Sequence, residues 1–144
     1  MAAWTSSLLS LLRAVAGLLI TMHGTQKLFG FPAAMPGGSA ELPTLMMAAG
    51  IIEVAGGILL LFGLLTRLTA FALSGEMAVA YFKTHAPQGF WPLMNGGELA
   101  ALYCFVFLFL AAAGPGPWSV DSLMRPRVAG TIPAEARPHH RHAA

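Results

Sequence analysis

The chain has 144 residues, of which 56% are hydrophobic and only 10% carry a fixed charge. An ordinary soluble domain has about 25% charged residues, so the composition excludes a typical water-soluble domain and an intrinsically disordered chain. The formal net charge of +2 comes largely from arginines near the C-terminus and does not indicate a nucleic-acid-binding face. The single cysteine, Cys104, has no partner for an internal disulfide. The sequence therefore predicts an all-α integral membrane protein.

Four apolar stretches predict four membrane-spanning helices, at about residues 8–31, 43–65, 68–82 and 93–113. A spanning helix needs roughly 20 apolar residues, and four of them predict one helical bundle. The first stretch is expected to be a retained helix and not a signal peptide, because its N-terminal flank has no positive charge and Arg13 lies inside it. The loops at 31–42 and 83–92 contain several prolines and glycines, which end helices.

The basic residues predict the orientation of this bundle in the membrane. Lys27 and Lys83 lie toward one side, and the opposite side carries Arg13, Arg67 and the tail arginines, which are Arg125, Arg127, Arg137 and Arg141. By the positive-inside rule both termini are cytoplasmic, and the expected location is the bacterial inner membrane. Residues 1–117 are predicted to form the four-helix domain, and 118–144 a basic, flexible cytoplasmic tail containing Pro and His. This tail is expected to contact lipid headgroups.

Several ionisable side chains lie at membrane depth, judged from a rise of about 1.5 Å per helical residue. His23, Gln26, Lys27, Glu53 and Glu98 are all predicted to occupy the outer half of the bundle. A charged group in the bilayer is costly, so these side chains are expected to point inward and pair. Glycines on the face of the second helix that carries Glu53 would let a neighbouring helix approach closely.

Simpler interpretations remain open for some of these residues. The polar cluster as a whole would also serve to hold the helices in register, and Glu76 fits that structural role best. Arg13 and Arg67 are interpreted as topology anchors, and Lys83 and His85 as solvated loop residues. No metal site is predicted, because the chain lacks the paired Glu-x-x-His motifs of ferritin-like bundles. Nucleotide-binding and acyl-transfer motifs are also missing from the sequence.

Four motifs in order make the chain resemble the DoxX family of small bacterial membrane proteins. They are Leu11-Leu12-Arg13 with His23-Gly24-Thr25-Gln26-Lys27-Leu28-Phe29-Gly30, then Gly50-Ile51-Ile52-Glu53-Val54-Ala55-Gly56-Gly57, then Gly63-Leu64-Leu65-Thr66-Arg67, and Asn95-Gly96-Gly97-Glu98. The resemblance covers about residues 8–113. It implies a four-helix inner-membrane protein, in a family whose DoxD-like relatives include subunits of a thiosulfate:quinone oxidoreductase. Arg13, His23, Lys27, Glu53, Asn95 and Glu98 match family motifs.

The leading functional hypothesis is a membrane redox component that handles a quinone or a small quinone-like or sulfur substrate. Glu53, Glu98, His23 and Lys27 are the candidate catalytic residues, and His23, Gln26, Lys27 and Asn95 the candidate ligand-binding residues. The chain shows no evident electron carrier, so an enzymatic role would need a soluble or membrane redox partner. Two alternatives remain open: a non-enzymatic anchor or assembly subunit of a redox or stress-response complex, and a small-solute or proton transporter, which would require a homo-oligomer.

Overall fold

The computed structural model describes residues 2–33 and 44–124, and this part of the chain is all-α, without strands. Its helices are α1 (Ala2–Phe29), α2 (Thr44–Phe62), α3 (Thr66–Ala80), α4 (Pro92–Asn95), α5 (Glu98–Ala113) and α6 (Val120–Met124). A π-helical turn, Tyr81–His85, and a 3₁₀ turn, Ala86–Gln88, extend α3. The predicted all-α class is confirmed.

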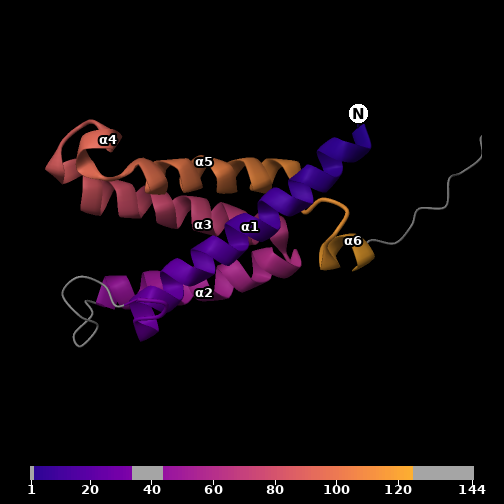
Figure 1. The fold of residues 1–144 in the computed structure, drawn as a ribbon, viewed down its shortest axis with the longest axis horizontal. Helices are drawn as coiled ribbons and strands as arrows, with labels where there is room; N and C mark the ends of the chain where they lie inside the picture. The colour runs from indigo at the N-terminus through magenta and orange to yellow at the C-terminus, as the bar shows by residue number, and fades with distance from the viewer. Residues whose placement is uncertain (1, 34–43, 125–144) are drawn as a thin grey trace, which may run out of the picture.

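The long helices pack mainly as two pairs, α1 with α2 and α3 with α5 (Figure 1). Consecutive long helices run in opposite directions, so the N-terminus and α6 lie at one end, and the 3₁₀ turn and α4 lie at the other (Figure 1). Two helical segments, Trp4–Phe29 and Thr44–Phe62, are long and apolar enough to cross a membrane, and the apolar Glu98–Ala113 is shorter. The sequence also predicted spans at 68–82 and 93–113, which correspond to the shorter helices α3 and α5.

The first pair of helices is held together by close backbone approach at glycines. A Cβ atom added at Gly24 would lie 2.7 Å from the backbone nitrogen of Val54, and one added at Gly57 would lie 2.7 Å from the carbonyl oxygen of Gly17. Small residues allow this packing where lipid supplies no hydrophobic driving force between helices. The prediction that the glycine face of the second helix admits a close neighbour is confirmed.

The remaining interior is a narrow apolar core, and the outward faces are also apolar. Ile20, Leu60, Leu73, Phe107 and Leu110 are fully buried between the pairs. Large apolar side chains point outward along the helices, including Phe71, Leu102 and Phe105. A protein that is apolar on both its inner and outer surfaces is suited to lipid as its solvent.

Arg13 contributes to the packing at the end that holds α6. Its side chain is only 2% exposed. Its guanidinium donates hydrogen bonds to the carbonyls of Leu60, Leu61 (2.9 Å), Pro115 (2.9 Å) and Trp118 (2.5 Å). It therefore joins α1 to the end of α2 and to the chain that follows α5, a structural role beyond that of the topology anchor inferred from the sequence.

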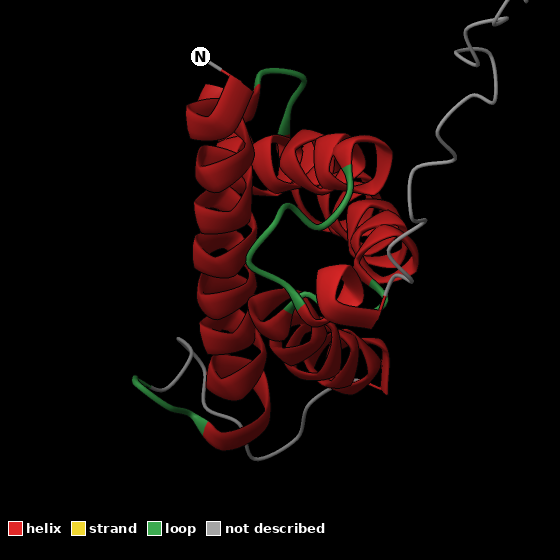
Figure 2. Cartoon of the chain, turned by 90° about the vertical axis from the view of Figure 1, so that its right-hand side faces the viewer, coloured by secondary structure: helices red, strands yellow, loops and turns green. Residues whose placement is uncertain are grey.

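Residues 118–124, which the sequence analysis assigned to a flexible tail, pack against the helices. The loop from α5 to α6 crosses the end of the molecule (Figure 2). Both carboxylate oxygens of Asp121 accept hydrogen bonds at the start of α3, from the backbone N–H groups of the N-cap residue Leu65 and of Thr66, at 2.8 Å each. This carboxylate supplies the N-terminal cap that α3 otherwise lacks. The rest of the predicted tail, 125–144, lies outside the described residues.

The predicted fourth helix, 93–113, is interrupted near its start. Gly96 adopts a left-handed conformation with φ of 66°, which divides α4 from α5. The Asn95 side chain accepts a hydrogen bond from the Gly97 N–H at 2.8 Å and donates one to the Gly89 carbonyl at 2.7 Å. Local side-chain bonds of this kind compete with helical bonding, and they explain why the helix restarts at Glu98.

Candidate functional site

A buried ion pair joins α1 to α2 near the end opposite α6. The Lys27 ammonium contacts Oε1 of Glu53, whose side chain is only 1% exposed. The other carboxylate oxygen, Oε2, is buried and has no hydrogen-bond partner within the described residues. Buried polar atoms are nearly always paired, so this oxygen marks a position where a donor from another molecule would be stabilised.

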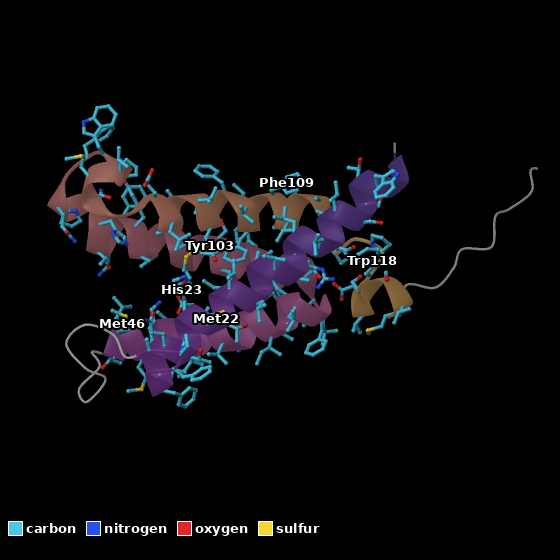
Figure 3. The ribbon with its side chains drawn as sticks, in the orientation of Figure 1. Met22, His23, Met46, Tyr103, Phe109 and Trp118 are labelled. Atoms are coloured by element: carbon cyan, nitrogen blue, oxygen red, sulfur yellow. The ribbon has the colours of Figure 1, made fainter. Side chains whose placement is uncertain are left out.

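The ion pair lies in the wall of a cavity of about 260 Å³. The cavity is bounded by α1, α2, α3 and α5, and its other polar lining comes from His23, Tyr103 and His85. His23 and Tyr103 face one another from α1 and α5, with ring centroids 6.1 Å apart in an edge-to-face arrangement (Figure 3). Tyr103 is in turn stacked on Phe107, with centroids 5.4 Å apart. A small cavity with aromatic walls suits a planar ring.

A second, larger cavity of about 560 Å³ lies between α2 and α3. Its lining is mainly aliphatic, and Lys27, Ala80 and His85 line it as well as the first cavity. Glu76 is the carboxylate in its wall, and the Oε2 atom of Glu76 is also buried without a hydrogen-bond partner in the described part of the chain. The two cavities are therefore neighbours on either side of Lys27.

The segment after α3 borders the first cavity through His85. Nδ1 of His85 lies 3.0 Å from the carbonyl oxygen of Asn95, which ties the π-helical turn to α4. The hydroxyl of Tyr81 donates to the carbonyl of Phe90 at 3.3 Å. These contacts hold a segment that the sequence analysis interpreted as a solvated loop.

The structure brings together three of the predicted site residues, His23, Lys27 and Glu53, all in the wall of the smaller cavity. Asn95 is buried but bonds to its own loop, and neither it nor Gln26 lines either cavity. Glu98 is exposed at the first position of α5 and is also absent from both walls.

Two residues of the cavity wall were missed by the sequence analysis. Tyr103 lies within the apolar stretch of α5. Its phenol is a polar group in that stretch, but the sequence analysis considered only charged groups and histidine there. His85 lies in a segment rich in loop-forming residues, and only the helical continuation of α3 brings it to the cavity. In the described ranges, no group of three or more His, Cys, Asp and Glu side chains is arranged to hold a metal ion.

Long apolar helices with apolar outer faces are typical of a helical membrane protein, and the buried ion pair beside a small cavity is a candidate ligand site in it. The sequence profile of the DoxX family matches residues 8–86 of this chain. The protein belongs to the DoxX family, as the motifs in its sequence indicated.

Relatives with similar sequences agree with this assignment. An uncharacterized protein of Haemophilus influenzae is 45% identical over 118 residues, covering 79% of this chain and 88% of the relative. An uncharacterized membrane protein of Mycobacterium tuberculosis is 31% identical over 132 residues, covering 81% and 80%. A Bacillus subtilis protein named as a candidate oxidoreductase, CatD, is 33% identical over 108 residues, covering 72% and 77%. No solved structure matches the chain significantly.

Proposed function

We propose that this DoxX-family protein is a component of a membrane redox system and binds a one-ring, quinone-like compound in the cavity beside Lys27 and Glu53. The observation that carries the proposal is the unpaired Oε2 of Glu53 next to the Lys27 ammonium in the wall of that cavity. A lysine ammonium has three N–H donors, and the ion pair uses one of them. The site therefore offers donors to a ring carbonyl and an acceptor to a ring hydroxyl.

The size of the cavity narrows the class of ligand. Sites for drug-sized molecules occupy roughly 300–1,000 Å³, whereas this cavity measures about 260 Å³. A single substituted ring fits such a volume and a flavin or dinucleotide does not. The edge-to-face pair of His23 and Tyr103 supplies the aromatic wall.

The proposal assigns a role to each predicted residue. Lys27 binds a ring oxygen, while Glu53 and His23 exchange with the ring the two protons that accompany a two-electron change of a quinone. The electrons come from a separate redox partner protein. Glu98 is assigned to proton exchange at the outer surface, and Asn95 and Gln26 to shaping the approach to the cavity.

The proposed topology is four spans in a bacterial inner membrane, with both termini in the cytoplasm. The π-helical turn, Tyr81–His85, and the 3₁₀ turn lengthen α3 to 23 helical residues in all, 15 plus five plus three. That length exceeds the roughly 20 residues needed to span a bilayer. The end that holds the N-terminus and α6 carries Arg13 and Arg67, which the positive-inside rule places in the cytoplasm.

Binding of a chain-free quinone ring tests the proposed site. The purified protein in lipid nanodiscs is titrated by calorimetry with the chain-free parent ring of ubiquinone. The wild type is expected to bind it, and Glu53→Gln and Lys27→Met are expected to weaken binding at least tenfold. Arg67→Met is the matched control, because Arg67 is an exposed cation at the opposite end of α3. A wild-type protein that binds no ring would overturn the proposed function.

A non-enzymatic membrane subunit is the second candidate, and the ion pair itself favours it, since Lys27 and Glu53 tie α1 to α2. In that case Lys27→Met lowers thermal stability while the wild type binds no ring. Pull-down of a stable partner protein by such a chain would support the subunit role.

A further inference from the structure

The cavity between α2 and α3 results from the way these helices diverge. They are joined by a tight turn at residues 63–65 and separate toward the opposite end (Figure 1). Lys27 and His85 line the space between them. Small alanine side chains, among them Ala49 of α2 and Ala72 of α3, alternate with larger apolar ones along this space. The result is a groove of about 560 Å³, which we call the chain groove. Its volume is more than twice that of the cavity of about 260 Å³ beside Lys27 and Glu53, which we call the ring cavity.

The chain groove adjoins the ring cavity. Lys27, Ala80 and His85 belong to both walls. A molecule whose polar end contacts Lys27 in the ring cavity therefore has the apolar groove directly beside it. This adjacency argues for one ligand that occupies both spaces.

The lining of the groove defines the chemistry of its occupant. Leu45, Met46, Ile52 and Val79 present hydrocarbon, which favours a hydrocarbon chain. The ionisable lining consists of Glu76, whose Oε2 is buried and unpaired, together with Lys27, Lys83 and His85, so groups of both signs are present and the wall does not single out an anionic headgroup. Ala72 and Ile52 are also exposed at the outer surface of the helices, so the groove opens sideways, where a membrane protein meets lipid.

We propose that the chain groove holds the alkyl or isoprenoid chain of a neutral amphiphile whose ring occupies the cavity beside Lys27 and Glu53. The inference rests on the proposed function and narrows its substrate class from any small ring to a membrane-dissolved, chain-bearing one. The ligand enters laterally from the bilayer, with its ring leading.

The test compares the chain-free parent ring of ubiquinone with decylubiquinone, in nanodiscs of one lipid composition. The measured quantity is the ratio of the two dissociation constants, ring over decyl compound, in each variant. Ala49→Phe and Ala72→Phe fill the groove and are expected to lower this ratio at least tenfold while leaving the affinity for the ring within twofold. Ala55→Phe is the matched control, because Ala55 is an exposed alanine of α2 outside both cavity walls, and it is expected to leave the ratio unchanged.

Photocrosslinking keeps the test valid if a phenylalanine variant does not fold. Wild-type protein is labelled with decylubiquinone that carries a diazirine in its chain, and labelling is expected at Ile52 and Val79. Labelling confined to other helices, or an unchanged ratio of dissociation constants in the groove variants, would overturn the proposed role of the chain groove. If the wild type still binds the chain-free ring in that case, the proposed function stands. Loss of a copurified phospholipid from the groove variants, with the ratio unchanged, would assign the groove to a structural lipid instead. If neither compound binds the wild type, both proposals fall.

Discussion

Replacing Arg13 by methionine should strongly destabilise the protein. Methionine keeps an unbranched apolar side chain of helix-forming type but removes every donor of the guanidinium. The carbonyls that lose a hydrogen bond belong to two separate segments, namely the end of α2 and the loop between α5 and α6. The change therefore acts on contacts between segments and leaves the helix that carries it intact.

The magnitude follows from the carbonyls left without a donor. Leu60 still accepts a bond from the N–H of Gly63 at 3.0 Å, so it is only partly affected. Leu61, Pro115 and Trp118 lose the bonds that Arg13 gives them. The bond to Pro115 is buried and those to Leu61 and Trp118 are partly buried, and an unpaired buried polar group costs about 1–3 kcal/mol, so the loss is about 3 kcal/mol. For a chain of this length, that corresponds to a fall in Tm of roughly 10 °C.

Thermal unfolding followed by circular dichroism in a mild detergent measures this loss. Arg67→Met is the control, because Arg67 also donates to carbonyls, those of Ala111 and Ala112, but is exposed. Its contribution is expected to be below about 1 kcal/mol, or a shift of roughly 3 °C. A Tm for Arg13→Met equal to that of Arg67→Met would refute the reasoning, since burial would then have no effect on the strength of these bonds.

Four further substitutions test the helix packing and the local hydrogen bonds. Gly57→Ala should lower the free energy of unfolding by about 1–3 kcal/mol, because the added methyl group pushes α1 from α2. Gly75→Ala should raise it by up to about 1 kcal/mol, because an added Cβ there meets nothing within 4 Å. Thermal melting curves in detergent distinguish the two variants, and equal losses of stability would contradict close packing at Gly57. Asp121→Ala should cost about 0.5–2 kcal/mol by removing the cap of α3, seen as faster protease cleavage after α5; cleavage at the wild-type rate would disprove the capping role. Asn95→Ala should speed hydrogen exchange at the Gly97 amide, which loses its side-chain acceptor and keeps only the carbonyl of Pro92 at 3.0 Å; an unchanged rate would mean that the bond to Pro92 alone protects this amide.

Local sequence pattern was enough to predict the helices and the ion-paired residues. Long apolar runs can satisfy their backbone groups in lipid only as helices, and this fixes the existence of α1 and α2. The cost of isolated charge in an apolar setting led to Lys27 and Glu53, which the structure pairs. The glycines of α2 signalled a close neighbour through their size alone.

What the sequence did not reveal depends on contacts between distant positions. The acceptors of Arg13 at Pro115 and Trp118 lie 102 and 105 residues further along the chain, so no local pattern records them. Asp121 appeared to be a tail residue because the segments it caps are 55 and 56 residues away. The break before Glu98 required knowing that Asn95 bonds to Gly89 and Gly97, which depends on how the whole loop folds.

The carbonyls bound by Arg13 also impose an order on the assembly of the protein. A chain made from its N-terminus delivers Arg13 to the membrane more than a hundred residues before Pro115 and Trp118 are synthesised. Until then only its acceptors on α2, the carbonyls of Leu60 and Leu61, are available to the guanidinium. The packing of α1 is therefore complete only after the segment that follows α5 has been made, so this helix reaches its final position later than its place in the sequence suggests.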